Sequence, residues 1–195
     1  MEGALRRALP LKEIDMTTTT SSTAQTVTRT FSRTKGLANG LLEGVSAEQF
    51  ARFPVADGKA INTNHAAFVY GHLSIYPKTI LGVLGKDSSS IEIPAKFTDL
   101  FMHGVDCQDD PNGDIYPPMD EIVSYFNKAH DVLIDAINEI DDETLNAVFT
   151  GDDWYVDFAQ TPASLCIFML HDHYMFHLGQ MSAWRRCVGL GPASM

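Results

Sequence analysis

The chain has 195 residues, with 14 Lys plus Arg, 25 Asp plus Glu and 7 His, so its formal net charge is −11. This length suits one domain of about 100–200 residues with a substantial hydrophobic core. The acidic charge argues against a nucleic-acid-binding protein and against a polybasic protein of the membrane surface, because both need a basic face. An acidic domain rich in histidine remains.

The N-terminal segment, residues 1–22, is predicted to be a flexible tail. Thr17 to Ser22 is a run of hydroxyl side chains with little to bury, and Met16 is an alternative start. The arginines near the N-terminus precede no apolar segment of a secretory signal, and three widely spaced cysteines form no disulfide framework. No run approaches the roughly 18 apolar residues of a membrane span. We therefore expect one cytoplasmic domain over residues 23–195.

Four stretches have the spacing of apolar residues that is typical of helices. The first helix is predicted over about residues 24–43, and a short capped turn follows at Ser46 to Gln49. The second helix is predicted over residues 61–85, with Asn62 or Asn64 as its N-cap.

Two long connections separate the remaining helices. Residues 86–117 are interpreted as a crossover between bundle helices, and their acidic DDPNGD segment as a turn, because it lacks the ligand offsets of an EF-hand. The third helix is predicted over residues 118–140, with an apolar stripe opposite a charged face. Residues 141–160 form the second connection, for which a strand pair or a turn around residues 149–158 both stay open.

The fourth helix is predicted from Thr161 as N-cap, with Pro162 at its first position, to a C-cap at Gly189. Its SLCIFML segment is apolar on all sides, which indicates a helix buried in a bundle. Together the elements predict an all-α fold, a four-helix bundle with long crossover connections.

Five histidines lie on the second and fourth helices. His173 and His177 are at i and i+4, so both rings lie on one face and can bind one metal ion. His171 points roughly 200° away from His173 on a regular helix. The third ligand must come from another helix, and His65 and His72, two turns apart on one face, are the candidates. Three neutral imidazoles leave a coordination position open, as at catalytic zinc, nickel or iron sites. Hydrogen-bonded core histidines are the alternative.

Other residues near these motifs have simpler interpretations. Gln180 is seven residues from His173 and is a candidate to hydrogen-bond a ligand or substrate. Cys166 falls on the same face of a regular helix and is interpreted as a buried, inert thiol. The remaining residues are expected to have no role at the site. Loop or surface positions are expected for His103 and His130, and core positions for Tyr70, Tyr76 and Phe176.

Two motifs resemble those of the DinB-like superfamily. The C-terminal one is HYMFHLGQM, from His173 to Met181, followed by WRR and by GLGP at residues 189–192. The second is NTNHAAFVYGHLSIYPKTIL, which resembles the second-helix motif in which a Gly-His or Ala-His pair supplies a metal ligand. The resemblance covers about residues 24–192.

The resemblance implies a four-helix bundle of the DinB type and a metal site formed by His72, His173 and His177. It leaves His65, Gln180 and His171 as neighbours that could hydrogen-bond the ligands. The implied cofactor is nickel, zinc or iron, and some relatives use low-molecular-weight thiols. We therefore expect a metal-dependent transferase or hydrolase that acts on a small molecule and forms a homodimer. The alternative is a non-catalytic dimeric bundle in which the histidines bind a structural metal or only pack.

Overall fold

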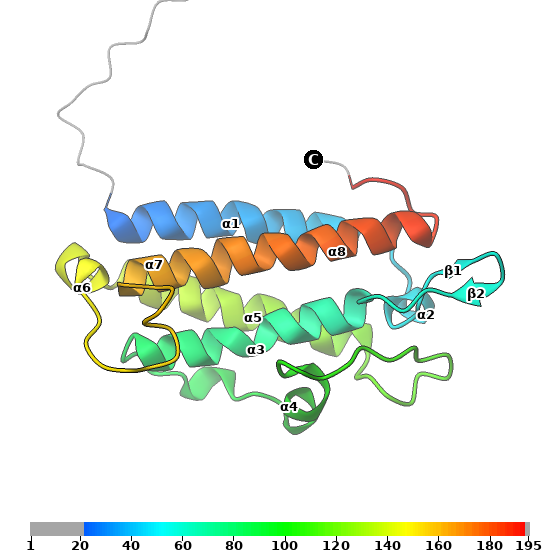
Figure 1. Cartoon of the computed structure of the whole chain (residues 1–195), viewed down its shortest axis with the longest axis horizontal. Helices are drawn as coiled ribbons and strands as arrows, with labels where there is room; N and C mark the ends of the chain where they lie inside the picture. Colours follow the sequence, from blue (N-terminus) through cyan, green and yellow to red (C-terminus); the bar gives the residue numbers. More distant parts are fainter. Residues whose placement is uncertain (1–21, 194–195) are drawn as a thin grey trace, which may run out of the picture.

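The computed structural model describes residues 22–193. The expected N-terminal tail lies outside these residues except for Ser22. The long helices run side by side along the long axis of the molecule (Figure 1). They are α1 (Thr23–Leu41), α3 (Ala66–Val83), α5 (Met119–Asn138) and a continuous segment made of α7 (Pro162–Ile167), η2 (Phe168–Asp172) and α8 (His173–Cys187). Helices α1 and α3 each pack against both α5 and α8, and the prediction of an all-α protein is confirmed.

Helices α1 and α5 lie where the apolar spacing predicts them. The hydroxyl of Ser22 accepts a hydrogen bond from the backbone N–H of Gln25 and so caps α1. The short helix α2 (Ala47–Phe50) has the predicted capping box between Ser46 and Gln49, with both hydrogen bonds formed. Phe31 of α1 and Phe126 of α5 are almost fully buried, so the apolar stripes of the two helices face a common core.

Helix α3 lies at the centre of the molecule and is buried along most of its length. Its N-cap is His65, so the prediction of Asn62 or Asn64 is wrong. The Nδ1 atom of His65 accepts a hydrogen bond from the backbone N–H of Phe68 at 3.2 Å, as an Asn oxygen would. At the other end, Gly85 takes a φ of +65°, which lets the chain turn out of the helix.

The connections contain more structure than the sequence predicted. The first includes η1 (Ser89–Ile91) and α4 (Ala95–Phe101), which packs against α3, and the second includes α6 (Asp142–Asn146). A turn and no strand is found around residues 149–158. Strands β1 (Val55–Ala56) and β2 (Lys59–Ala60) form a hairpin that was not predicted. Asp57 and Gly58 join them with φ of 51° and 73°, the left-handed values of a tight hairpin turn.

The fourth helix begins as predicted but is not regular. Thr161 forms a capping box with Ser164, and Pro162 occupies the first turn. Segment η2 is a π turn, in which the backbone N–H of His173 bonds to the carbonyl of Phe168, five residues back. The extra residue rotates the preceding segment by about 100° relative to α8. The π turn therefore removes Cys166 from the face of His173, where a regular helix would place it. Cys166 is fully buried, as expected.

Candidate metal centre

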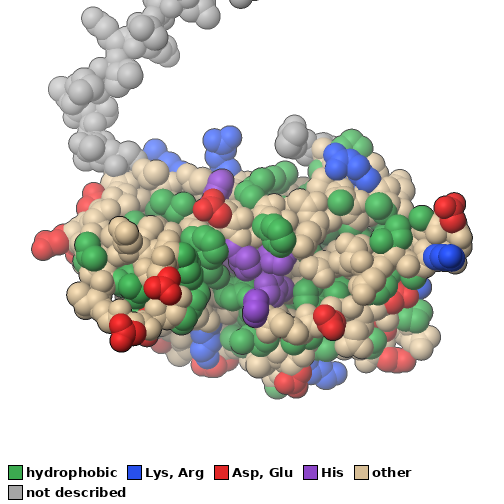
Figure 2. Space-filling model, viewed as in Figure 1, with side chains coloured by type: hydrophobic (Ala, Val, Ile, Leu, Met, Phe, Trp, Pro, Cys, Tyr) green, Lys and Arg blue, Asp and Glu red, His purple; other side chains and the backbone are tan. Residues whose placement is uncertain are grey.

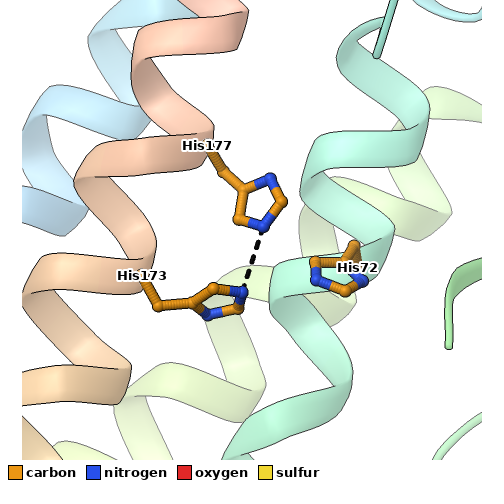
Figure 3. A group of neighbouring side chains, drawn as sticks. All are labelled: His72, His173 and His177. Carbon is orange, nitrogen blue, oxygen red and sulfur yellow. Dashed lines mark hydrogen bonds between the residues drawn. The ribbon is translucent and has the colours of Figure 1, made fainter. Parts of the chain in front are cut away.

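Three histidines from two packed helices converge on one point (Figure 3). His72 comes from the middle of α3, and His173 and His177 come from the first two turns of α8. The Nε2 atoms of His173 and His177 lie 3.0 Å apart. One ligand nitrogen from each ring lies within 4.8 Å of the other two, and no other such group of His, Cys, Asp or Glu is found in residues 22–193.

Two of the rings are oriented by hydrogen bonds on the side away from this point. Nδ1 of His72 donates to the backbone carbonyl of Phe101 at 2.7 Å. Nδ1 of His177 donates to Oε1 of Gln180 at 3.0 Å, and the same oxygen accepts a hydrogen bond from Asn64 at 3.0 Å. Because each of these two rings carries its hydrogen on Nδ1, its Nε2 atom has a lone pair that can accept a hydrogen bond or bind a metal ion. Partners of this kind fix the tautomer and direction of histidine ligands in metal sites.

All three imidazoles are neutral at pH 7. Burial, together with the neighbouring rings of His177 and His72, lowers the pKa of His173 to about 3. Burial likewise lowers the pKa of His177 to about 4. The pKa of His72 is also lowered, again mainly by burial. Neutral imidazole is the form that binds metal, so these rings need lose no net proton to become ligands.

The arrangement fits a divalent cation. The Nε2 atoms of His173 and His177, 3.0 Å apart, can share one hydrogen, and Nε2 of His72 lies 3.3 Å from the hydroxyl of Tyr76. Nδ1 of His173, which cannot bind the same ion as Nε2 of that ring, is buried and has no hydrogen-bond partner in the described part of the chain. A metal with Zn–N distances of 2.0–2.1 Å would hold tetrahedral ligand nitrogens about 3.3 Å apart. The α8 pair is close to this spacing, and all three lone pairs would then be satisfied.

The centre reaches solvent on one side. Figure 2 shows histidine side chains at the middle of one face of the molecule, next to hydrophobic ones. His72 and His177 are buried, whereas His173 is half-buried. A cavity of about 780 Å³ lies elsewhere, between α2 and residues 110–123, and none of the three histidines lines it. The histidines therefore lie at an open edge between α3 and α8 and not in this cavity.

Tyr76 also belongs to this centre, although its sequence position was not interpreted as part of a site. It was expected in the core, but its ring is half-buried and lies 5.0 Å from the rings of both His72 and His173. Its hydroxyl is 3.3 Å from Nε2 of His72. Phe176, also expected in the core, is 66% exposed and contacts the ring of His177. The signal for Tyr76 was its spacing, since residues four apart share a helix face.

The residues proposed as neighbours of the ligands separate into two groups. Gln180 bonds His177, as described above. His65 does not reach the centre, because its Nδ1 caps α3 and its Nε2 bonds the carbonyl of Gln108 at 2.8 Å. His171 lies 3.0 Å from the carboxylate of Asp172 and lines a groove beside α1.

The two histidines expected at the surface or in loops also differ from each other. His103 is exposed, as expected. His130 is fully buried on α5, so a surface position is wrong for it. Its Nδ1 donates to the carbonyl of Phe126, and its Nε2 accepts a hydrogen bond from the hydroxyl of Tyr174. These bonds satisfy both ring nitrogens inside an apolar core.

Comparison with known proteins gives one family. The model of the DinB superfamily matches residues 14–181, a range that includes His72, His173 and His177. No curated protein matches the chain. Between residues 22 and 193, no helix combines the length and the apolar character needed to cross a bilayer. Because the match spans well over half of the sequence and both histidine motifs, the chain belongs to the DinB superfamily.

Proposed function

We propose that this protein is a metal-dependent enzyme that binds nickel, zinc or iron through His72, His173 and His177. The observation that carries the proposal is the convergence of three neutral imidazoles whose ligand nitrogens lie within 4.8 Å of one another at an open edge of the fold. We further propose that α1, α3, α5 and the α7–α8 segment form the four-helix bundle of the DinB type. The hydrogen bonds from His72 to Phe101 and from His177 to Gln180 support this role, because they orient ligands in advance.

The proposed reaction class is a thiol-dependent transfer or a hydrolysis on a small molecule. When bound, the metal would act as a Lewis acid that lowers the pKa of a coordinated water or low-molecular-weight thiol. The chain's own residues hold the three ligand nitrogens and leave the half-buried side of His173 accessible. The net charge of −11 disfavours nucleic acid as a partner. A homodimer in the cytoplasm remains part of the proposal.

Metal content is the direct test. Protein purified without a histidine tag should contain about one transition-metal ion per chain, and adding zinc, nickel or cobalt to chelator-treated protein should raise its melting temperature. At a free metal concentration of a hundred times Kd, the stabilisation is about 2.7 kcal/mol, which corresponds to a shift of roughly 5–10 °C for a chain of this size.

Single substitutions define the ligands. His72→Ala, His173→Ala and His177→Ala should each abolish this shift. His171→Ala is the matched control, because His171 precedes α8 by two residues but bonds Asp172 and not the cluster. A wild-type protein that binds no metal would refute the proposal.

The alternative, a bundle with a structural metal, has a different signature. If the metal is structural, the metal-free protein and the His173→Ala variant should be largely unfolded. If the metal is catalytic, both should stay folded but lose the transfer of a low-molecular-weight thiol to a chromogenic electrophile, or the hydrolysis of a chromogenic ester. Half-burial of His173 favours the catalytic case, because a structural site has all of its coordination positions closed.

A further inference from the structure

The hydroxyl of Tyr76 has one hydrogen-bond partner among the described residues, and that partner is a proposed metal ligand. Tyr76 lies one turn after His72 on α3, and its hydroxyl is 3.3 Å from Nε2 of His72. Because Nδ1 of His72 already donates to Phe101, Nε2 is the acceptor and the tyrosine hydroxyl is the donor. In the metal-free protein, the lone pair that would coordinate the ion therefore accepts the phenolic hydrogen.

Metal binding changes this bond. A lone pair that coordinates an ion cannot also accept a hydrogen bond, so the hydroxyl of Tyr76 would lose its partner. The half-buried ring is held between the rings of His72 and His173, at 5.0 Å from each, so the hydroxyl stays beside the ion. A polar group left there without a partner costs free energy. A ligand with an acceptor atom at the open coordination position would restore the hydrogen bond.

From this geometry we infer that Tyr76 donates a hydrogen bond to the exogenous ligand of the metal and selects ligands with an anionic donor atom, such as a thiolate, hydroxide or carboxylate. This inference rests on the proposed metal site and specifies what that site binds. The exposed side chain that contacts the ring of His177, Phe176, is apolar and offers no hydrogen. Tyr76 thus supplies a hydrogen beside the ion, and an anionic donor atom accepts such a hydrogen bond more strongly than a neutral one.

The test uses the full chain loaded with cobalt(II) and titrated with azide, an anionic ligand, at fixed pH, with the d–d absorption spectrum as readout. In Tyr76→Phe, the Kd for azide should rise about 10- to 100-fold, the range for a hydrogen bond to a charged group, while the Kd for cobalt stays within about threefold of wild type. Tyr125→Phe is the matched control. That half-buried tyrosine donates to the carbonyl of Ile91 and packs against the ring of Phe97, and among residues 22–193 it has no hydrogen bond or ring contact with the three histidines, so its substitution should change neither constant.

Every outcome decides the inference. Azide binding by Tyr76→Phe with the wild-type Kd would overturn it, as would a wild-type cobalt protein that binds no azide. A large loss of cobalt affinity in Tyr76→Phe would overturn it too, since the phenol would then be a metal ligand itself. Failure of the wild-type protein to bind cobalt would overturn both the inference and the proposed function, so the two failures are distinguishable. Thermal unfolding of each variant confirms that it is folded.

Discussion

The buried histidine of α5 should make the protein sensitive to acid. His130 is fully buried, with its ring 4.5 Å from that of Phe126 and 5.4 Å from that of Phe31. Burial lowers the pKa of His130 to about 3, from 6.5. The replacement His130→Gln removes the titrating group and keeps polar atoms that can bond Tyr174. We expect this variant to lose less stability than wild type when the pH falls.

The sign and size follow from proton linkage. Between pH 6.5 and 3 the unfolded chain binds a proton at this histidine and the folded chain does not, so the contribution is complete above pH 6.5 and is lost as the pH falls toward 3. From pH 7 to pH 5, proton binding at His130 stabilises the unfolded state by an amount equivalent to a shift of about 1.4 pH units. At 1.36 kcal/mol per unit, the free energy of unfolding should fall by about 2 kcal/mol through His130 alone.

Urea unfolding at pH 7 and pH 5, with a chelator present, measures this difference. His173 and His177, whose pKa values are also lowered, contribute equally to both proteins and cancel in the comparison. The substitution itself is expected to destabilise at both pH values, so the relevant quantity is the change with pH. If wild type and His130→Gln lose the same free energy between pH 7 and pH 5, His130 is not a neutral buried group and the argument is wrong.

Three further substitutions test contacts that stabilise the fold or orient a ligand of the proposed metal site. Gly71→Ala should destabilise by about 1–3 kcal/mol in thermal unfolding, because a Cβ would overlap the buried ring of Phe101; Gly179→Ala, where a Cβ meets nothing within 4 Å, should not. Gln180→Leu should raise the Kd for zinc about 10- to 100-fold by calorimetry, since it frees the ring of His177. Arg185→Met should destabilise by about 2–3 kcal/mol in urea, because the buried guanidinium bonds several backbone carbonyls; unchanged midpoints would refute this.

The sequence predicted the parts of the fold that depend on local spacing. The capping box at Ser46, the N-cap at Thr161 and the limits of α1 and α5 follow from side chains within four residues of one another. The hairpin at Asp57 and Gly58 also carried a local signal, the Asp-Gly pair, which was overlooked. The N-cap of α3 could not be read in this way. His65 replaces the neighbouring asparagines there because its second nitrogen bonds a distant loop at Gln108.

The candidate site was predictable to the same extent. His173 and His177 share a face by their spacing alone, but the choice of His72 over His65 depends on how α3 packs against α8. A surface or loop position was predicted for His130, although its spacing from apolar residues indicates burial. It follows Phe126 by four residues and precedes Leu133 by three, so it lies on the apolar stripe of α5. A histidine on such a stripe is buried when partners for both nitrogens are available, and Tyr174 supplies one of them.

The π turn of η2 had no signal in the sequence, yet it determines where the histidine pair lies. The SLCIFML segment is apolar on every side, so it has no alternation of apolar and polar faces. One extra residue in the helix therefore leaves no visible break in the sequence pattern. On a regular helix the buried positions Cys166 and Met169 would be followed by His173, which would face the core. With the extra residue, Tyr174 takes the core position against His130, and its neighbour His173 is half-buried at the edge that faces α3. The π turn thus moves the first ligand of α8 from the core to the open edge, where it meets His72.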